Sequence, residues 1–352
     1  MDLLLRIGGS LIGVVMVVAF LRSIAQVALI NRQGGDWLAR RVGRLVYRTV
    51  ARVARRRRSY DRRQDALAWI FPIYMLLLIT TWFALVQVGF SLLIWSSQAE
   101  HSWLQAVIAS GSALSTLGFL TPPDISGQLL AIPEGAMGLG IVVFLFTFIP
   151  GYQTAIQARE VKVDWLYART GAEPANFALV EWLQLSGRLD DSDLWEDWEV
   201  WFRNLAQNLT LAPVLAFVPS VHSNQTWLIA AAVVLDAASF YLSALDAGAQ
   251  PSALLCHTTG VRALHLITAQ LGNHHSPEAA RSAGSHLDRS IFNTACDRLA
   301  ALGAPVKSDR DDCWRRFSEL RQEYEVFLPK LANSLLLIST HQSDFRISVE
   351  NA

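Results

Sequence analysis

The chain has 352 residues, of which 52% are hydrophobic and only 17% are charged. A soluble globular domain carries roughly 25% charged residues, so this composition argues against disorder and against an ordinary cytosolic protein. The formal net charge is zero, yet no Lys or Arg lies between Arg63 and Arg159, whereas residues 32–63 hold twelve arginines and two acids. We therefore expect a membrane protein with strongly segregated charge.

Three segments are apolar and long enough to cross a membrane, which needs about 20 apolar residues for roughly 30 Å of hydrocarbon. They are residues 3–21, 66–95 and 136–158. A cleaved signal peptide is the alternative for the first segment, but it would need positive charge before the apolar run and a small-residue cleavage site after it. Asp2 precedes the run, and Arg22 follows it without such a site. We therefore predict a retained helix, in which Gly9 and Gly13 permit close packing.

The linker of residues 32–65 has the pattern of a basic amphipathic helix. Its arginines recur every three or four residues, at Arg41, Arg44, Arg48, Arg52 and Arg55. Such a helix suits a membrane surface, where each cation gains about 1 kcal/mol from anionic lipid. A voltage-sensing helix is the sharper alternative, but it would need a surrounding bundle of apolar helices. We expect no binding to nucleic acid, since membrane topology already explains the charge.

The uneven distribution of arginine predicts an orientation, because Lys and Arg concentrate in cytoplasmic loops. The linker is then cytoplasmic, the N-terminus and residues 96–135 lie outside, and residues 159–352 lie inside. We expect the plasma membrane, and specifically a bacterial inner membrane. The chain would divide into an N-terminal helix of residues 1–31, the linker, a segment of residues 66–158 that holds the other two spans and the loop between them, and a cytoplasmic domain of residues 159–352.

The external loop of residues 102–124 is too apolar for a loop in water. Residues 103–114 carry no charge, which is too short for a span but suits a half-helix that enters the bilayer and turns back. Non-helical backbone at membrane depth is tolerated where protein buries it or water reaches it, so the residues after the half-helix should face a cavity. We call these residues the candidate filter: Ser115, Thr116, Leu117, Gly118, Phe119 and Leu120. Gly118 is free to adopt a left-handed conformation, and a run of carbonyls can replace the hydration shell of a cation.

The succession of helix, half-helix, candidate filter and helix resembles the pore of the potassium channel superfamily. Four positions match the family's Thr-Val-Gly-Tyr-Gly filter, namely Thr116, Leu117, Gly118 and Phe119. Leu120 departs from it by replacing the second Gly, whose backbone freedom shapes the outermost ring of carbonyls. The loop is also similar to those of Trk/Ktr-type potassium transporters, a looser pattern that involves Ser112, Ala113, Thr116, Gly118 and Thr121.

The resemblance implies a passive cation channel that favours potassium, with K⁺ as its permeant ligand and no cofactor. One loop cannot enclose a pore, so four copies of the chain would assemble around an axis. Pro150 and Gly151 would form a gating hinge in the third span, or else they simply end it. The alternative to a channel is a membrane-anchored sensor or scaffold, in which the apolar hairpin is structural and conducts nothing.

Residues 159–352 predict a helical domain with a core of its own and an unidentified ligand or partner. Two amphipathic helices are expected, over residues 193–205, where Asp193 followed by Glu196 resembles a capping box, and over residues 311–331. Residues 227–245 are apolar, but Asp236 at their centre favours a buried helix over a fourth span.

The sequence contains no recognisable motif for metal binding or catalysis. Its histidines and cysteines, among them His257, His265, His274 and His275, lack the spacing of metal ligands. No motif for nucleotide binding or for a catalytic nucleophile is present either. We therefore expect neither a metal site nor an enzyme, but an all-α membrane protein with three spans, a re-entrant loop and a helical cytoplasmic domain.

Overall fold

The computed structural model describes residues 2–28, 36–57, 59–100, 102–171, 177–220, 225–271 and 287–337. Within these ranges every regular element is a helix, and an isolated bridge joins Leu245 to Val306. The chain divides into two compact units. The membrane unit comprises residues 1–50 and 69–154, and the tail unit comprises residues 51–68 and 155–352.

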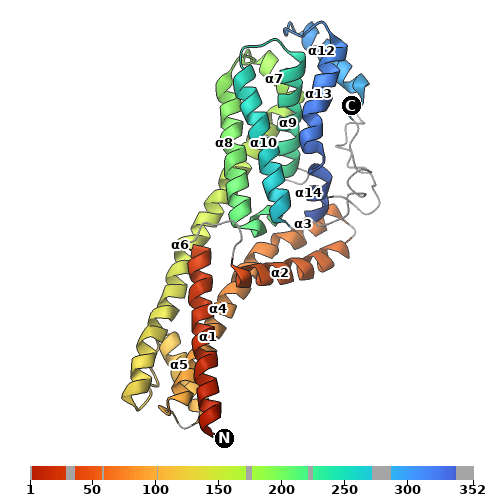
Figure 1. The fold of residues 1–352 in the computed structure, drawn as a ribbon. Helices are drawn as coiled ribbons and strands as arrows, with labels where there is room; N and C mark the ends of the chain where they lie inside the picture. Colours follow the sequence, from red (N-terminus) through yellow and green to blue (C-terminus); the bar gives the residue numbers. More distant parts are fainter. Residues whose placement is uncertain are drawn as a thin grey trace. The chain divides into compact units, whose positions relative to one another are not determined.

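The membrane unit is built from four apolar helices and the start of an arginine-rich one. They are α1 (Asp2–Ala28), α2 (Trp37–Arg55) as far as residue 50, α4 (Ile70–Ser96), α5 (Trp103–Leu114) and the first part of α6 (Ile125–Thr170). Helices α1 and α4 run antiparallel side by side (Figure 1). Ser10 at the start of α1 accordingly donates to Ser96 at the end of α4, over 2.7 Å. The N-terminus and the loop that follows α4 therefore lie at the same end of the unit.

Small residues bring α1 and α4 together. A Cβ atom placed on Gly13 would lie 2.7 Å from the carbonyl oxygen of Gly89, and one placed on Gly9 would lie 3.4 Å from the ring of Trp95. Both glycines of the predicted packing motif therefore face α4. The absence of a side chain lets the two backbones approach closely, as small residues do between helices in membranes.

A buried carboxylate fixes the start of α2. Asp36 accepts from the backbone N–H of Ala39 over 2.8 Å, which is the interaction of a helix N-cap. Its Oδ2 also accepts from Ser23 of α1 over 2.6 Å, and Ser23 in turn accepts from the indole N–H of Trp82 of α4 over 2.9 Å. This chain of hydrogen bonds ties the first turn of α2 to two apolar helices.

Among the described residues, four helices are long and apolar enough to cross a membrane: α1, α4 together with the preceding α3 (Tyr60–Ala68), α6, and α9 (Trp227–Ala244). The second predicted span is interrupted at Trp69, between α3 and α4. The third was predicted too short at both ends, because α6 runs for 46 residues and continues through Pro133 and Pro150. The Pro-Gly pair at residues 150 and 151 therefore does not end the helix.

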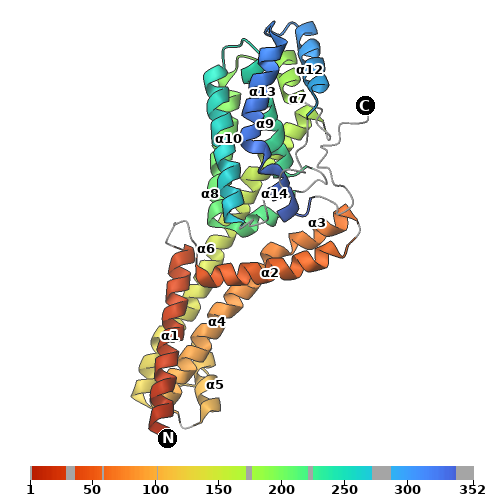
Figure 2. The same ribbon diagram turned by 45° about the vertical axis from the view of Figure 1, so that its right-hand side comes forward.

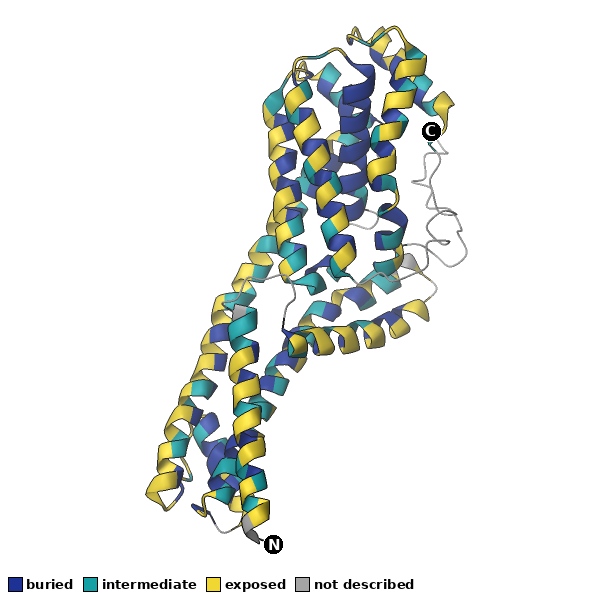
Figure 3. Ribbon diagram, viewed as in Figure 1, coloured by how far each residue is buried: buried dark blue, intermediate teal, exposed yellow. Residues whose placement is uncertain are grey.

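The tail unit is a helical bundle around α9. Besides the end of α2 and α3, its other helices are the end of α6, α7 (Ala178–Leu185), α8 (Ser192–Leu211), the 3₁₀ turn η1 (Pro213–Phe217), α10 (Gln250–Gln270), α12 (Arg289–Ala301), α13 (Arg310–Glu325) and α14 (Leu328–Ser334). Helix α9 packs against α10 and α13, and α10 packs against α8 (Figure 2). Every residue of α9 except Ile229 is buried (Figure 3). The prediction of a buried helix is confirmed in this respect, since α9 is covered by its own unit.

Asp236 of α9 is not left without partners in the apolar core. The side chain of Tyr324 donates a hydrogen bond to Asp236, and Arg321 Nε lies 3.3 Å from its Oδ1. Both partners come from α13 and both are buried. A buried charge persists where it is paired and hydrogen-bonded, so this contact fixes how α13 docks on α9.

Two local predictions for the tail were wrong. The expected helix over residues 311–331 is two helices, because α13 ends at Glu325 and α14 begins at Leu328 with Pro329 in its first turn. Proline is favoured there because its missing N–H is not needed at a helix start. The N-cap of α8 is Asp191 rather than Asp193. The apolar face predicted for α8 is confirmed, since Leu194, Trp198, Trp201, Phe202 and Leu205 are all buried.

Candidate functional site

Helix α5 has the predicted bounds and lies in the membrane unit, against α4. Its contact face consists of small residues, among them Ala106, Ala109 and Ser110, all completely buried. The amide of Gln87 on α4 donates to the carbonyl of Val107 over 2.8 Å. The half-helix is therefore fixed to α4 by close packing and by a polar contact that sequence inspection did not reveal.

Helix α6 closes over the other side of α5. A Cβ atom on Gly138 would lie 2.1 Å from the carbonyl oxygen of Leu114, and one on Gly135 would lie 3.2 Å from that of Ala113. Nearer the start of α6, a Cβ atom on Gly127 would lie 2.4 Å from Pro122. These glycines let α6 touch the last turn of α5 and the loop that follows it.

The chain leaves α5 through a compact turn of left-handed residues. Thr116 has φ +58° and Gly118 has φ +66°. The N–H of Thr116 bonds to the carbonyl of Ala113 over 3.0 Å, and that of Leu117 to the carbonyl of Ser112 over 3.1 Å. This is the hydrogen-bond pattern of a Schellman motif, with Thr116 at the left-handed position that Gly usually occupies. The left-handed conformation anticipated for Gly118 is present, whereas that of Thr116 was not foreseen.

Ser112 organises the candidate filter. Its carbonyl accepts from the N–H groups of Leu117 and Gly118, and its hydroxyl accepts from the N–H of Leu120 over 3.0 Å. Among the residues that the structure describes, no hydrogen bond is accepted by the backbone carbonyls of residues 115–121. The loop therefore turns its N–H groups toward α5 and leaves a run of carbonyls available to another partner.

The sequence predicts that the candidate filter faces a cavity. Within the single chain, its side chains lie on the surface instead. Residues 115–119 are exposed, with Leu117 72% and Phe119 67% accessible, and Leu120 is half-buried. Large apolar side chains at such exposure indicate a surface that lipid or another chain covers.

Compared with families of known proteins, with characterised proteins and with solved structures, the chain has no match. The geometry of its own residues therefore carries the functional argument.

The arginines predicted to face lipid all lie on one exposed side of α2. They are Arg41, Arg44, Arg48, Arg52 and Arg55. The opposite side is buried, with Val42, Val46, Val50 and Ala54 at intervals of one helical turn. The guanidinium of Arg41 stacks on the exposed ring of Trp37, 4.1 Å from its centroid. The amphipathic helix is thus present as predicted, and its exposed face combines cations with an aromatic ring.

The proposed hinge residues, Pro150 and Gly151, are exposed in a continuous α6, and a Cβ atom on Gly151 would touch nothing within 4 Å. Within the tail unit, the end of α6 is held by the buried Arg159. Its guanidinium donates to the carbonyls of Leu215 over 3.0 Å and Val218 over 2.8 Å. Arg159 therefore anchors α6 to the turn η1, a role that the charge pattern did not predict.

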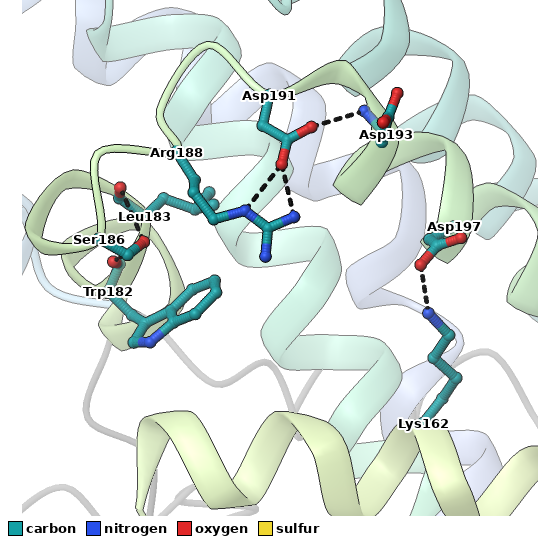
Figure 4. A network of polar contacts seen from close by, with 8 residues as sticks. All are labelled: Lys162, Trp182, Leu183, Ser186, Arg188, Asp191, Asp193 and Asp197. Carbon is teal, nitrogen blue, oxygen red and sulfur yellow. Dashed lines mark hydrogen bonds and ion pairs between the residues drawn. The ribbon is translucent and has the colours of Figure 1, made fainter.

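The acidic start of α8 is explained by capping. Asp191 accepts from the backbone N–H of Asp193 and from the guanidinium of Arg188, and Lys162 of α6 bonds to Asp197 over 2.6 Å (Figure 4). The hydrogen bond from Arg188 lowers the pKa of Asp191 below its ordinary value. Acids at a helix N-terminus are favoured by the dipole, so these residues have a structural role.

Within the described part of the chain, no group of three or more His, Cys, Asp or Glu side chains could hold a metal ion. His257 is buried, which lowers its pKa, and His274 and His275 lie outside the described residues. The three cysteines are free and buried, and burial raises the pKa of Cys296 to about 11. Such thiols are poor nucleophiles.

Proposed function

We propose that the chain is one subunit of a cation channel, and that four copies assemble so that residues 115–120 surround a common axis. The observation that carries the proposal is the turn after α5, where left-handed Thr116 and Gly118 accompany a run of carbonyls without hydrogen-bond partners among the described residues. Rings of backbone carbonyls are what selective potassium channels use in place of water around the ion.

The exposed apolar side chains of the loop support assembly. The described residues of the chain leave Leu117 and Phe119 exposed, while α4 and α6 pack against α5. A closed ring of identical subunits would bury them against neighbours and bring the carbonyls together. Leu120, in place of the family's second Gly, would weaken the outermost site and reduce the preference for K⁺ over Na⁺.

We also propose an orientation of the chain in the membrane. With residues 32–65 on the cytoplasmic side, the N-terminus and the loop after α4 lie outside, which agrees with their position at the same end of the membrane unit. The exposed arginines of α2 would then bind anionic lipid of the inner leaflet. A membrane-impermeant thiol reagent should label Gln98→Cys, but not Leu254→Cys, in intact cells. Labelling of the second variant from outside would contradict the orientation.

Ion flux into liposomes tests the proposed conduction. Purified wild-type protein should carry K⁺ down its concentration gradient and carry Na⁺ more slowly. The Leu120→Gly variant should have a higher selectivity for K⁺ over Na⁺. A wild-type protein that assembles as a stable monomer and passes no cation would leave the membrane-anchored scaffold as the better account.

A further inference from the structure

Glu134 is a completely buried acid in the membrane unit. It is the sole acid among residues 125–158, and it lies in α6 with none of its surface exposed. An ionisable side chain is costly inside a membrane, and where one occurs it usually has a functional role. Its position, directly before Gly135, places it beside the last turn of α5.

The partners of Glu134 are neutral. One carboxyl oxygen is hydrogen-bonded to the hydroxyl of Ser110 on α5, and the other has no hydrogen-bond partner among the described residues. The hydroxyl of Ser110 also lies 3.0 Å from the carbonyl oxygen of Gln87 on α4. The amide of Gln87 is directed elsewhere, to Val107.

The helices packed around Glu134 offer no charge to balance a carboxylate. Helices α4 and α5 contain no Asp, Glu, His, Lys or Arg. The nearest ionisable residues in sequence are Asp124, which directly precedes α6 and lies about 15 Å away along the helix axis, and Tyr152 of α6, which is further still. An ionised Glu134 would therefore be a buried charge with one hydrogen bond and no cation, an arrangement that proteins avoid.

A count of hydrogens distinguishes the two protonation states. Ser110 has one hydroxyl hydrogen. If Glu134 is ionised, its carboxylate and the carbonyl of Gln87 compete for that hydrogen. If Glu134 is protonated, its O–H donates to the oxygen of Ser110, and the hydroxyl of Ser110 donates to Gln87. Each of the two contacts then has a hydrogen of its own.

We propose that Glu134 is a protonated acid that locks the end of α5 between α4 and α6, and that this proton controls the position of the candidate filter. Ser110 lies two residues before Ser112, whose carbonyl and hydroxyl hold the N–H groups of Leu117, Gly118 and Leu120. Loss of the proton removes a hydrogen bond and introduces a charge at the turn that shapes the filter. This part of the inference rests on the proposed conduction, whereas the protonation of Glu134 does not.

Infrared difference spectroscopy of the full chain in liposomes tests the proton directly. Wild type minus Glu134→Gln should contain the C=O absorption of a protonated carboxyl group at neutral pH. Asp124→Asn, which removes an exposed acid directly before the same helix, is the matched control and should instead lose a carboxylate band. A carboxylate band in the Glu134→Gln difference spectrum would overturn the proposal.

Potassium flux against pH tests the control of the filter. Wild-type flux should fall by about tenfold between weakly acidic and alkaline pH, a coupling of ordinary size for a binding site linked to function. Glu134→Gln keeps a neutral hydrogen-bond donor and should retain the acidic-pH flux at every pH. Ser110→Ala removes the receiving hydroxyl and should lower flux at every pH.

Equal pH dependence in wild type and Glu134→Gln would refute the control by Glu134. A wild type that passes no ion at any pH would refute the proposed conduction and its control together. The infrared band would still decide whether Glu134 holds a proton.

Discussion

Replacing Gly138 by Ala is the sharpest mechanical test of how α6 holds the half-helix. The added Cβ atom would meet the carbonyl oxygen of Leu114 at 2.1 Å, well inside the 3.4 Å at which ordinary contact begins. The obstacle is backbone and not the end of a flexible side chain, so α5 and α6 would have to separate by about 1 Å. Overpacking of this kind costs typically about 1–3 kcal/mol.

Gly140 provides the matched control, because it lies on the same helix and a Cβ atom there would touch nothing within 4 Å. Both substitutions replace a glycine inside a helix by alanine, whose higher helix propensity stabilises each variant by about 1 kcal/mol. Because both variants gain this amount, it cancels when their stabilities are compared. Gly138→Ala should therefore be less stable than Gly140→Ala by about 1–3 kcal/mol.

Unfolding of the full chain in a mixed-detergent titration, followed by circular dichroism, measures this difference. The two variants should bracket the wild type, with Gly140→Ala at or above it and Gly138→Ala below it. Gly138→Ala should also lower K⁺ flux, because a displaced α5 carries the candidate filter with it. Equal stability of the two variants would refute the close contact between α6 and the end of α5.

Three further predictions concern single residues. Gly118→Ala should cost about 1 kcal/mol in backbone strain, because the residue has φ +66° while its Cβ atom would meet no neighbour, and K⁺ flux should fall without a change in the mass of the assembly. Asp236→Ala should lower the free energy of unfolding of the tail by about 3–5 kcal/mol, since it leaves Arg321 buried without its partner, and an unchanged thermal midpoint would contradict this. Asp191→Ala should lower stability at neutral pH by about 1 kcal/mol through loss of the N-cap. The lowered pKa of Asp191 means that its contribution is present above the unfolded-state pKa and lost as pH falls through the folded-state value, so melts of variant and wild type should converge in acid.

Local signals in the sequence predicted several elements well. The charge-free run of residues 103–114 is a helix with those bounds. The arginines of α2 recur every three or four residues, close to the 3.6 residues of a helical turn, and this spacing predicted which face of the helix is exposed. Asp236 at the centre of residues 227–245 predicted a buried helix, and α9 is buried within its own unit.

Contacts between distant residues were not predictable in the same way. Glu134 reaches Ser110 across 24 residues, and Asp236 reaches Tyr324 across 88. No periodic pattern in the sequence predicts such pairs. The single acid in the apolar stretch around Glu134 was nevertheless a sequence signal for the first pair. The left-handed Thr116 was missed because its conformation follows from the helix end it closes, and local preference would have assigned Gly there.

The length of α6 was underestimated for a related reason. The sequence left open whether Pro150 and Gly151 form a hinge in the third span or end it, and α6 passes through both Pro133 and Pro150 as one continuous helix. A proline removes one hydrogen bond and kinks or breaks an isolated helix, but flanking turns and packing can maintain the helix. The glycines that face α5 provide such packing around Pro133.

Recording of currents from purified protein in a planar bilayer tests the proposed function most directly. Wild-type protein should give discrete unitary currents carried by K⁺, with a reversal potential that shifts toward the K⁺ equilibrium potential when Leu120 is replaced by Gly. Gly118→Ala protein that assembles normally should give no such currents. A bilayer that stays silent with correctly assembled wild-type protein, over the full range of pH and voltage, would contradict it.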